Sequence, residues 1–439
     1  MDITDFAQEK HFRFVCKEII RYSFTLHQLF IREATDIHIN SHHFRRKTMK
    51  NFEFYAPTKI IFGKNTESQV GEQIIAFGGK KVLIHYGSES VKKSGLLARV
   101  QDSLNQHQLP FVELGGVVPN PRLSKVLEGI ELAKKENVDF ILAVGGGSVI
   151  DSAKAIGYGV YDGGNVWDFF ERKRQITGCL PIGCILTIAA AGSEMSNSCV
   201  ITNEEGWLKR GSKSDTGRPK FSILNPELTY TLPAYQTASG IVDILMHTIE
   251  RYFSNESMDL TDHMAEALLR TVIEHAYVLM ANPTNYHARA EIMWASSLSH
   301  NGLLGCGTDG GDWSPHQLEH ELGGMFDVAH GAGISAVWGS WARYVYKSNV
   351  ERFAKFAISV MDVPPHQNPE GTALAGIAAM EDFFRDIQMP TTLTELGIEV
   401  TDEQIELLAE KCSFFNTRTI GLIQPLNKED MIAIYKMAR

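Results

Sequence analysis

Between residues 49 and 232, short apolar segments alternate with stretches of helical periodicity. Residues 81–86 and 110–114 are typical of strands, and residues 123–135 show the spacing of an amphipathic helix. Residues 140–144 are apolar without interruption, as expected for a strand that is buried on both faces of a parallel sheet. Strands that alternate with helices predict right-handed βαβ units, and therefore a nucleotide-binding type of sheet.

After Pro233 the pattern changes to long helical periodicity with few strand candidates. The predicted helices cover residues 234–253, 259–280, 285–303 and 313–323, with more from 350 to 436. We therefore expect an α/β dinucleotide-binding domain over residues 49–232 and an all-helical domain over residues 233–439. Ligands usually bind in the crevice between two such halves.

The first 48 residues differ from the rest of the chain. Their most apolar run, residues 12–31, contains Lys17, Glu18 and Arg21, so it cannot span a bilayer as a helix. The segment also lacks the cleavage site of a secretory signal and is too acidic for a mitochondrial presequence. We predict that residues 1–48 are a disordered or non-native extension, and that strand-like residues 52–55 begin the fold.

Composition and charge narrow the class of protein. The 439 residues are 44% hydrophobic and 21% charged, which excludes fibrous and disordered proteins. The formal net charge of -10 argues against a nucleic-acid or anionic-membrane partner. Six cysteines without a Cys-x-x-Cys pair suit a reducing compartment. We expect a cytoplasmic protein.

A glycine-rich turn is the first candidate for chemistry. Gly145, Gly146, Gly147 and Ser148 follow the strand at residues 140–144 and begin a helix. Glycines let the backbone approach a phosphate closely, and the N–H groups and dipole of a helix N-terminus attract the anion. A tight turn with positive φ would explain the same glycines. The segment also differs from the Gly-x-Gly-x-x-Gly fingerprint of ordinary Rossmann domains.

The first predicted strand ends in a second turn, which contains Gly87 and Ser88. The adenosine half of a dinucleotide could lie here. No acidic residue stands alone in this turn to accept a ribose 2′-hydroxyl, and Lys92 and Lys93 follow closely. The pattern favours a 2′-phosphate, and therefore NADP(H) over NAD(H), although Glu89 weighs against it.

Histidines are the second candidate for chemistry. The sequence holds sixteen, and eight of them lie in one stretch of the helical half. Asp243 and His247 are four residues apart, so on a helix they share a face, and His316 and His320 have the same spacing. A Gly-Gly pair is expected to end the second of these helices, so that the chain turns back with His330.

Three imidazoles and a carboxylate suit a divalent metal ion such as Fe²⁺ or Zn²⁺. Buried or surface histidines with purely structural roles would give the same spacing. A further alternative is a hydrolase, because His316-x-x-Glu319-His320 matches the inverted zincin motif, in which the histidines bind zinc and the glutamate is the base. A third is a nucleotide-binding regulatory protein without activity.

Four motifs together resemble the iron-containing (group III) alcohol dehydrogenases, in particular their butanol dehydrogenase-like branch. They are Gly-Gly-Gly-Ser-x-x-Asp-x-Ala-Lys at 145–154, Gly-Ser-Glu at 192–194, Asp-x-x-x-His at 243–247, and His-x-x-x-His at 316–320 with His-Gly at 330–331. The likeness spans residues 51–439. It implies an α/β dinucleotide-binding domain followed by an all-α metal-binding domain, the dehydroquinate synthase-like fold.

The same resemblance implies a function and a role for individual residues. It implies hydride transfer between NAD(P)H and a small aliphatic aldehyde or primary alcohol, with a glycerol-type dehydrogenase as the alternative within the superfamily. The implied metal ligands are Asp243, His247, His316 and His330, with Fe²⁺ favoured over Zn²⁺, and the implied catalytic residue beside the nicotinamide is His320. The cofactor-binding residues, most of them implied by the resemblance, are Gly87, Ser88, Asn120, Gly146, Gly147, Ser148, Asp151, Thr187 and Lys220.

Three further expectations concern the cofactor, the proton and the substrate. A small residue at Ser88 resembles the family members that use NADP(H). His320 is the candidate proton relay, because imidazole titrates near neutrality. Apolar residues near the histidines favour a small hydrophobic substrate; they are Trp294, Trp313, Met325, Phe326 and Trp338. We also expect a homodimer.

Overall fold

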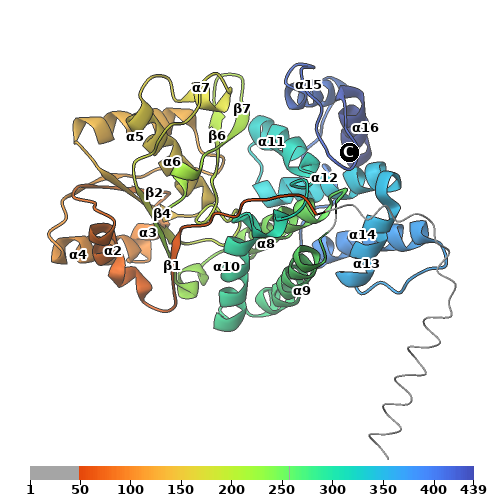
Figure 1. The fold of residues 1–439 in the computed structure, drawn as a ribbon, viewed down its shortest axis with the longest axis horizontal. Helices are drawn as coiled ribbons and strands as arrows, with labels where there is room; N and C mark the ends of the chain where they lie inside the picture. Colours follow the sequence, from red (N-terminus) through yellow and green to blue (C-terminus); the bar gives the residue numbers. More distant parts are fainter. Residues whose placement is uncertain (1–48, 257) are drawn as a thin grey trace, which may run out of the picture. The chain divides into compact units, whose positions relative to one another are not determined.

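The computed structural model describes residues 49–256 and 258–439, which belong to one compact unit. The predicted extension, residues 1–48, lies outside the described residues. Figure 1 shows the α/β elements on the left and helices α11–α16 on the right, with α8 between them. Among the described helices, none is long and apolar enough to cross a membrane.

A six-stranded parallel sheet forms the centre of the α/β half, in the order β1-β8-β5-β4-β2-β3. Its strands are β1 (Lys59–Phe62), β2 (Val82–Tyr86), β3 (Phe111–Leu114), β4 (Phe140–Gly145), β5 (Ile182–Leu186) and β8 (Phe221–Leu224). The strands predicted at 81–86, 110–114 and 140–144 are β2, β3 and β4, so these three predictions are confirmed.

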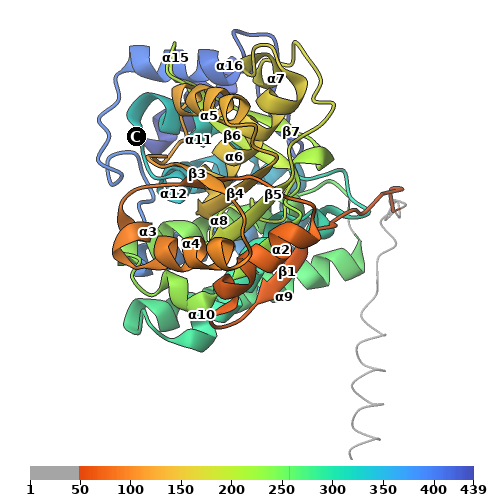
Figure 2. The ribbon, with the colours of Figure 1, turned by 90° about the vertical axis from the view of Figure 1, so that its left-hand side faces the viewer.

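Helices cover both faces of this sheet, which explains why β4 is apolar throughout. Figure 2 shows the strands between α5 and α6 on one side and α2, α3 and α4 on the other. Phe140, Leu142 and Val144 pack into one core, whereas Ile141 and Ala143 pack into the other. The α/β helices are α2 (Val70–Ala76), α3 (Ser90–Lys93), α4 (Leu96–Gln106), α5 (Leu123–Lys135), α6 (Gly147–Asp162) and α7 (Trp167–Phe170), with 3₁₀ turns η1 (Thr66–Gln69), η2 (Asp215–Gly217) and η3 (Pro226–Thr229).

An antiparallel hairpin, which the apolar pattern did not reveal, stands beside this sheet. Its strands are β6 (Ser198–Asn203) and β7 (Leu208–Lys213). The hairpin packs against α6 on one side and against α11 on the other. It escaped prediction because β7 carries three cationic side chains in six residues (Lys209, Arg210 and Lys213), a composition more typical of a loop.

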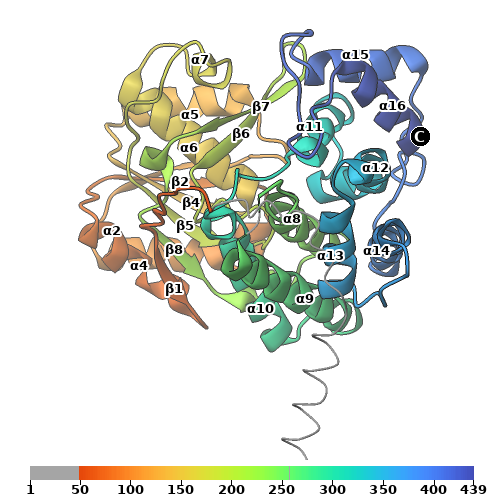
Figure 3. The same cartoon turned by 45° about the vertical axis from the view of Figure 1, so that its right-hand side comes forward.

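The helical half is organised around α8 (Ala234–Tyr252), in which every residue from 237 to 252 is buried. It packs against α9, α10 and α12 (Figure 3). The other helices are α9 (Asp259–Ala281), α10 (Tyr286–His300), α11 (Ser314–Phe326), α12 (His330–Val345), α13 (Val350–Ser359), α14 (Pro369–Asp386), α15 (Asp402–Cys412) and α16 (Lys428–Ala438), with 3₁₀ turns η4 (Leu303–Gly305) and η5 (Tyr346–Asn349). Secondary structure changes character at Pro233, the N-cap of α8, while a division into two domains there stays a prediction.

Two local expectations were wrong. Residues 52–55 form no strand; Phe52, Phe54 and Tyr55 are exposed, and the first strand begins at Lys59. The Gly-Gly pair does not end α11, which continues to Phe326 and ends before Asp327, whose φ is 53°. These glycines permit close packing instead, because a Cβ on Gly324 would lie 2.7 Å from the carbonyl oxygen of Trp207.

Candidate active site

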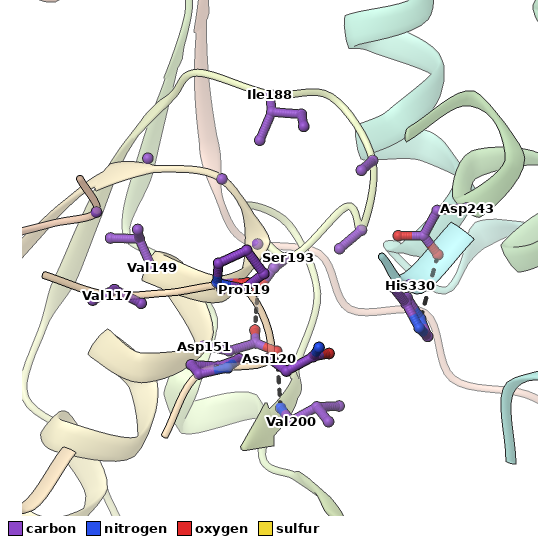
Figure 4. Close-up of a pocket in the computed structure, with 18 of the residues that line it drawn as sticks. Val117, Pro119, Asn120, Val149, Asp151, Ile188, Ser193, Val200, Asp243 and His330 are labelled. Atoms are coloured by element: carbon purple, nitrogen blue, oxygen red, sulfur yellow. Dashed lines mark hydrogen bonds and ion pairs between the residues drawn. The ribbon is translucent and has the colours of Figure 1, made fainter. Parts of the chain in front are cut away.

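A cleft of about 1870 Å³ runs from the carboxyl ends of the parallel strands to α8, α11 and α12. Figure 4 shows part of its lining, with Asn120, Asp151 and Ser193 of the α/β half across from Asp243 and His330. The sequence-predicted residues that line the cleft are Gly87, Ser88, Asn120, Gly146, Gly147, Ser148, Asp151, Thr187, Asp243, His247, His316, His320 and His330. The structure therefore brings residues from both halves of the chain to one cavity.

Lys220 is the predicted site residue that does not line this cleft. It is exposed at the amino end of β8, where its N–H donates to the carbonyl of Ile182 and its carbonyl accepts from Lys59. In a parallel sheet the amino ends of the strands lie at the edge opposite to the carboxyl ends. The predicted contact between Lys220 and the cofactor therefore has no support in the structure.

The glycine turn between β4 and α6 is shaped by close packing. None of Gly145, Gly146 and Gly147 has a positive φ, so a left-handed turn does not explain them. A Cβ on Gly146 would lie 2.0 Å from Cγ2 of Ile188, and one on Gly147 would lie 2.8 Å from Cβ of Ala191. No side chain caps the N-terminus of α6, which begins at Gly147 and faces the cleft. An uncapped helix N-terminus behind a glycine turn suits a pyrophosphate.

Asp151 is tied to the protein on both carboxylate oxygens. Oδ1 accepts from Ser193 Oγ (2.5 Å) and Oδ2 accepts from the N–H of Val200 (2.8 Å), as the dashed lines in Figure 4 mark. Lys154 is fully buried next to it and donates to the carbonyl oxygens of Ser193 and Ser198. These two residues hold the Gly-Ser-Glu segment and the start of β6, so the geometry supports a positioning role for Asp151.

Asn120 and Thr187 also line the cleft through specific contacts. Asn120 has a φ of 52°, and its Nδ2 donates to Asp327 Oδ1 (3.0 Å) and to the carbonyl of Val328 (3.2 Å). It thus joins the loop after β3 to the turn before α12, and a contact with the adenosine stays a prediction. Thr187 follows β5, and its N–H donates to the carbonyl of Gly145 (3.1 Å).

The lysines near Ser88 give less support to NADP(H) than the sequence indicated. The Lys92 ammonium is 2.8 Å from Glu89 Oε1, so its charge is already compensated. Neither Lys92 nor Lys93 is among the residues that line the cleft, whereas Gly87 and Ser88 are. Only the small side chain of Ser88 remains as an argument for a 2′-phosphate.

Three of the predicted metal ligands, all imidazoles, surround one carboxylate oxygen of the fourth, Asp243. Asp243 Oδ1 lies 3.5 Å from His247 Nδ1, 3.5 Å from His316 Nε2 and 3.7 Å from His330 Nε2. Asp243, His316 and His330 each offer a ligand atom within 4.8 Å of the others, and the His247 ring lies 4.6 Å from the His316 ring. Residues from α8, α11 and α12 therefore present nitrogen and oxygen donors to the same small volume.

Buried carboxylates orient two of these imidazoles from behind. His316 Nδ1 lies 2.7 Å from Glu250 Oε1, and His330 Nδ1 is hydrogen-bonded to Glu319. Lys209 Nζ in turn donates to both oxygens of Glu319, at 3.3 and 3.0 Å. A ligand histidine whose second nitrogen is held by a carboxylate is the usual outer layer of a metal site.

This outer layer was not predicted from the sequence. For Glu250 a signal existed, because it follows Asp243 by seven residues and His247 by three on the same helix, and so lies on the same face. For Lys209 no signal existed, because it belongs to the unpredicted hairpin.

The donors fit a divalent cation. Asp243 Oδ1, His247 Nδ1 and His316 Nε2 are buried without a hydrogen-bond partner, which is uncommon for polar atoms in protein interiors. Burial lowers the pKa of His316, but Glu250 and Asp243 outweigh it and raise that pKa to about 9. The pocket therefore favours a positive charge at this point, and a metal ion with nitrogen and oxygen ligands would provide it.

The inverted zincin alternative does not fit the structure. Glu319 is fully buried and bonded to Lys209 and His330, so it is not free to act as a base. Burial opposes its ionisation, but His330 and Lys209 prevail and lower its pKa. The donor atom of His316 is grouped with Asp243 and His330 and not with His320.

His320 lies beside the metal donors and lines the cleft, with its ring 5.8 Å from that of His330. Its pKa is well below the usual value, first because of burial and then because of Lys209 and His330. The imidazole is therefore neutral, so a proton relay through it starts from the neutral ring. His300, at the end of α10, also lines the cleft, with its ring 4.0 Å from that of His247.

Of the five apolar residues expected near the substrate, only Trp313 lines the cleft. Trp338 is fully buried in the helical core, Trp294 is exposed on α10, and Met325 and Phe326 pack against the core. Four of the five residues therefore give no support to a hydrophobic substrate. Sequence proximity to the histidines did not show which face of each helix meets the cleft.

Comparisons with known proteins agree with this architecture. Residues 57–226 match the family described as iron-containing alcohol dehydrogenase, and residues 237–439 match the C-terminal part of the Fe-containing alcohol dehydrogenase family. The chain is 40% identical over 390 residues to NADH-dependent butanol dehydrogenase A of Clostridium acetobutylicum, covering 88% of this chain and 99% of the relative. It is 33% identical over 395 residues to the NADPH-dependent aldehyde reductase YqhD of Escherichia coli, covering 89% and 100%.

A solved structure shows the same fold. The crystal structure of NADH-dependent butanol dehydrogenase A from Thermotoga maritima superimposes with a TM-score of 0.86 at 40% identity, covering 89% of this chain and 99% of that chain. The sequence match, the shared fold and the donor cluster in the cleft agree with one another. The chain therefore belongs to the iron-containing alcohol dehydrogenase family.

Proposed function

We propose that this protein is a metal-dependent alcohol dehydrogenase that interconverts short aldehydes and primary alcohols with a nicotinamide cofactor. One observation carries the proposal: the glycine turn before α6 and the donor cluster around Asp243 open into the same cleft. A hydride donor held at the turn and a carbonyl oxygen held at the cluster could therefore meet there. Neither a hydrolase nor a purely regulatory protein needs this combination.

Separate sets of residues would bind the cofactor and the metal. The backbone N–H groups at Gly147 and Ser148 would hold the pyrophosphate, while Asp151 and Lys154 keep the neighbouring loop in place. Asp243, His247, His316 and His330 would hold a divalent metal, which when bound polarises a carbonyl oxygen. The nicotinamide supplies or accepts the hydride.

His320 is the proposed proton relay. It lines the cleft and makes no hydrogen bond to another described residue, so both ring nitrogens are available. In the reducing direction one ring N–H donates to the substrate oxygen, and the other nitrogen takes up a proton from water in the cleft. Burial and Lys209 keep the ring neutral. A neutral ring has one N–H that can donate and one nitrogen that can take up a proton.

The choice of metal and cofactor is the finer part of the proposal. The nitrogen and oxygen donor set suits Fe²⁺ or Zn²⁺, and the name of the family favours Fe²⁺. Ser88 favours NADP(H), although the relatives include enzymes named NADH-dependent and one named NADPH-dependent. A homodimer and a cytoplasmic location stay predictions.

The test follows the loss of NAD(P)H absorbance with butanal after Fe²⁺ or Zn²⁺ has been restored to stripped protein. We expect turnover that requires the metal. His320→Ala should keep its metal and lose roughly 100-fold in rate, a typical effect of removing a general acid or base. Cofactor binding without aldehyde-dependent oxidation, or a His320→Ala protein that has lost its metal, would contradict the proposal.

A further inference from the structure

Among the described residues that line the cleft, two cationic side chains make neither an ion pair nor a hydrogen bond. Lys213 ends β7, and Arg172 lies in the turn after α7; both line the cavity. Within residues 49–256 and 258–439 neither side chain makes an ion pair or a hydrogen bond, and the ring contact of Arg172 is with Phe414. Both side chains are solvent-exposed at the cleft lining, so an anion in the cleft can reach them.

The neighbouring charges of the hairpin are compensated. Lys209 pairs with Glu319 at 3.0 Å, and Arg210 pairs with Glu321 at 2.8 Å. Lys213 and Arg172 lack such a carboxylate, so the hairpin presents excess positive charge only on the side where Lys213 lies. Arg174 and Arg418 also line the cleft without an ion pair to another described residue, but each donates to a backbone carbonyl oxygen, which Lys213 and Arg172 do not.

A third cation strengthens the imbalance. Arg251 is buried behind Trp313, 4.5 Å from its ring centroid, and donates to the carbonyl oxygens of His247 and Ser299 but to no carboxylate. Partial desolvation of the Lys213 ammonium lowers its pKa, and the positive charges of Arg251 and Arg172 lower it further. Lys213 and Arg172 form a cationic wall of the cleft. An anion bound to this wall would reduce the electrostatic repulsion among the three cationic side chains.

The position of the cationic wall indicates which molecule would carry the bound anion. Lys213 Nζ lies 5.6 Å from the Trp313 ring centroid, and the same ring lies 5.4 Å from that of His316. One indole ring thus separates the cationic wall from the metal donors. The glycine turn already offers a place for the cofactor pyrophosphate, and Ser88 lies two residues after β2, so we assign the wall beside Trp313 to the substrate and not to the cofactor.

We propose that the cleft selects short aldehydes and alcohols that carry a terminal anionic group, which Lys213 and Arg172 bind. This inference rests on the proposed function. In the reducing direction the hydride passes from the nicotinamide to the carbonyl carbon and a proton reaches the oxygen, giving the alcohol and oxidised cofactor. The anionic group takes no part in the chemistry and fixes the orientation of the chain across Trp313.

The test compares 4-oxobutanoate, glycolaldehyde phosphate and neutral butanal as substrates of the metal-loaded full chain. We expect kcat/KM for at least one anionic aldehyde to exceed that for butanal by at least about tenfold, as one charge-assisted contact would give. The preference should weaken as salt is added. A carboxylate or a phosphate preference would each support the inference and identify the anion.

Variants assign the preference to residues. Lys213→Met and Arg172→Met should each raise KM for the preferred anionic aldehyde about tenfold, with kcat/KM for butanal within about twofold of the parent. Lys220→Met is the matched control, because Lys220 is exposed outside the cleft. Calorimetry should show weaker binding of 4-hydroxybutanoate to both cleft variants and unchanged binding of the cofactor.

Three outcomes would overturn the inference. Butanal turnover without any preference for an anionic aldehyde would remove it and leave the proposed function intact. Variants that lose NAD(P)H affinity instead of aldehyde selectivity would assign the cationic wall to the cofactor. A protein that turns over none of these aldehydes would overturn the inference and the proposed function together.

Discussion

The two sides of the cleft are built in different ways. On the α/β side the candidate cofactor site is backbone: glycines without room for a Cβ and the uncapped N-terminus of α6. On the helical side the candidate metal site consists of ionisable side chains, with Asp243, Glu250 and Glu319 all buried. The cofactor side requires that the glycines carry no Cβ, whereas the metal side requires that buried charges compensate one another.

This difference has consequences for stability and function. Buried charges are costly unless partners compensate them, so removing one member of the helical cluster leaves others unpaired. A bound cation would complete that balance and couple metal content to folding. The glycine turn itself carries no side-chain charge, so defects there should affect cofactor binding and leave the metal in place. Four predictions test this separation.

The largest effect is expected from Asp243→Ala. It removes the carboxylate oxygen that lies within 3.7 Å of three imidazoles. Metal content should fall to background and the rate by about 1000-fold or more, beyond the roughly 10–100-fold that loss of an outer-layer partner typically causes. Metal analysis and steady-state rates check this, together with a cofactor dissociation constant that stays within about twofold. Full metal content in this variant would remove Asp243 from the ligand set.

The next largest effect is expected from Glu250, in the outer layer of the candidate metal site. Glu250→Leu leaves His316 Nδ1 without its acceptor, which lies at 2.7 Å, and should weaken metal binding roughly 10–100-fold. Glu250→Gln keeps an oxygen acceptor and should stay within a few-fold of the parent. Metal titrations of both variants measure the difference. Equal losses would show that charge, and not orientation of the imidazole, is the contribution of Glu250.

The third effect concerns acid stability on the α/β side. His85 is buried in β2 between the carbonyl of Leu114 and Ser152 Oγ, and burial lowers its pKa from 6.5 to about 4. Protonation therefore favours the unfolded chain, and stability present above the unfolded pKa is lost as the pH falls from 6.5 toward 4. Between about pH 7 and about pH 5 this loss should be about 2 kcal/mol.

Urea unfolding of metal-loaded protein and of His85→Gln at the two pH values measures this loss. Glutamine keeps a donor and an acceptor but does not titrate, so the variant should lose about 2 kcal/mol less on acidification. An identical pH dependence in the two proteins would show that His85 contributes nothing to acid sensitivity.

The smallest effect is expected from Gly146→Ala. The added Cβ would meet Cγ2 of Ile188 at 2.0 Å, so the loop after β5 must move away from the cofactor. We expect roughly tenfold weaker NAD(P)H binding, about 1.4 kcal/mol, with unchanged metal content. Gly305→Ala is the control, because the nearest atom to its Cβ would be 3.7 Å away and Gly305 lies outside the cleft. Loss of metal in Gly146→Ala would mean that the two sites are not separate.

The sequence predicted best what depends on spacing along one element. Uninterrupted apolar residues marked β4, and the i, i+4 pairs placed Asp243 with His247 and His316 with His320. The same spacing could have identified Glu250, which lies on the same face of α8 as Asp243. These features are local, so periodicity alone is enough to find them.

Features that depend on tertiary packing could not be predicted in this way. Gly323 and Gly324 resembled a helix end, but they are needed where α11 approaches β7. The roles of Lys209 and Lys213 depend on the packing of the hairpin against α11, which spacing along the sequence does not show. Lys220 was expected to bind the cofactor, but it lies at the amino end of β8 and does not line the cleft.

The central claim is that metal and cofactor act in one cleft, and it is tested most directly by titrating stripped protein with Fe²⁺ while measuring bound metal and butanal-dependent NAD(P)H oxidation in the same samples. We predict that activity rises in proportion to bound metal and saturates at one ion per chain. Asp243→Ala should gain neither metal nor activity. Full activity in the stripped protein, or a metal-saturated protein that binds NAD(P)H without oxidising it, would contradict the account.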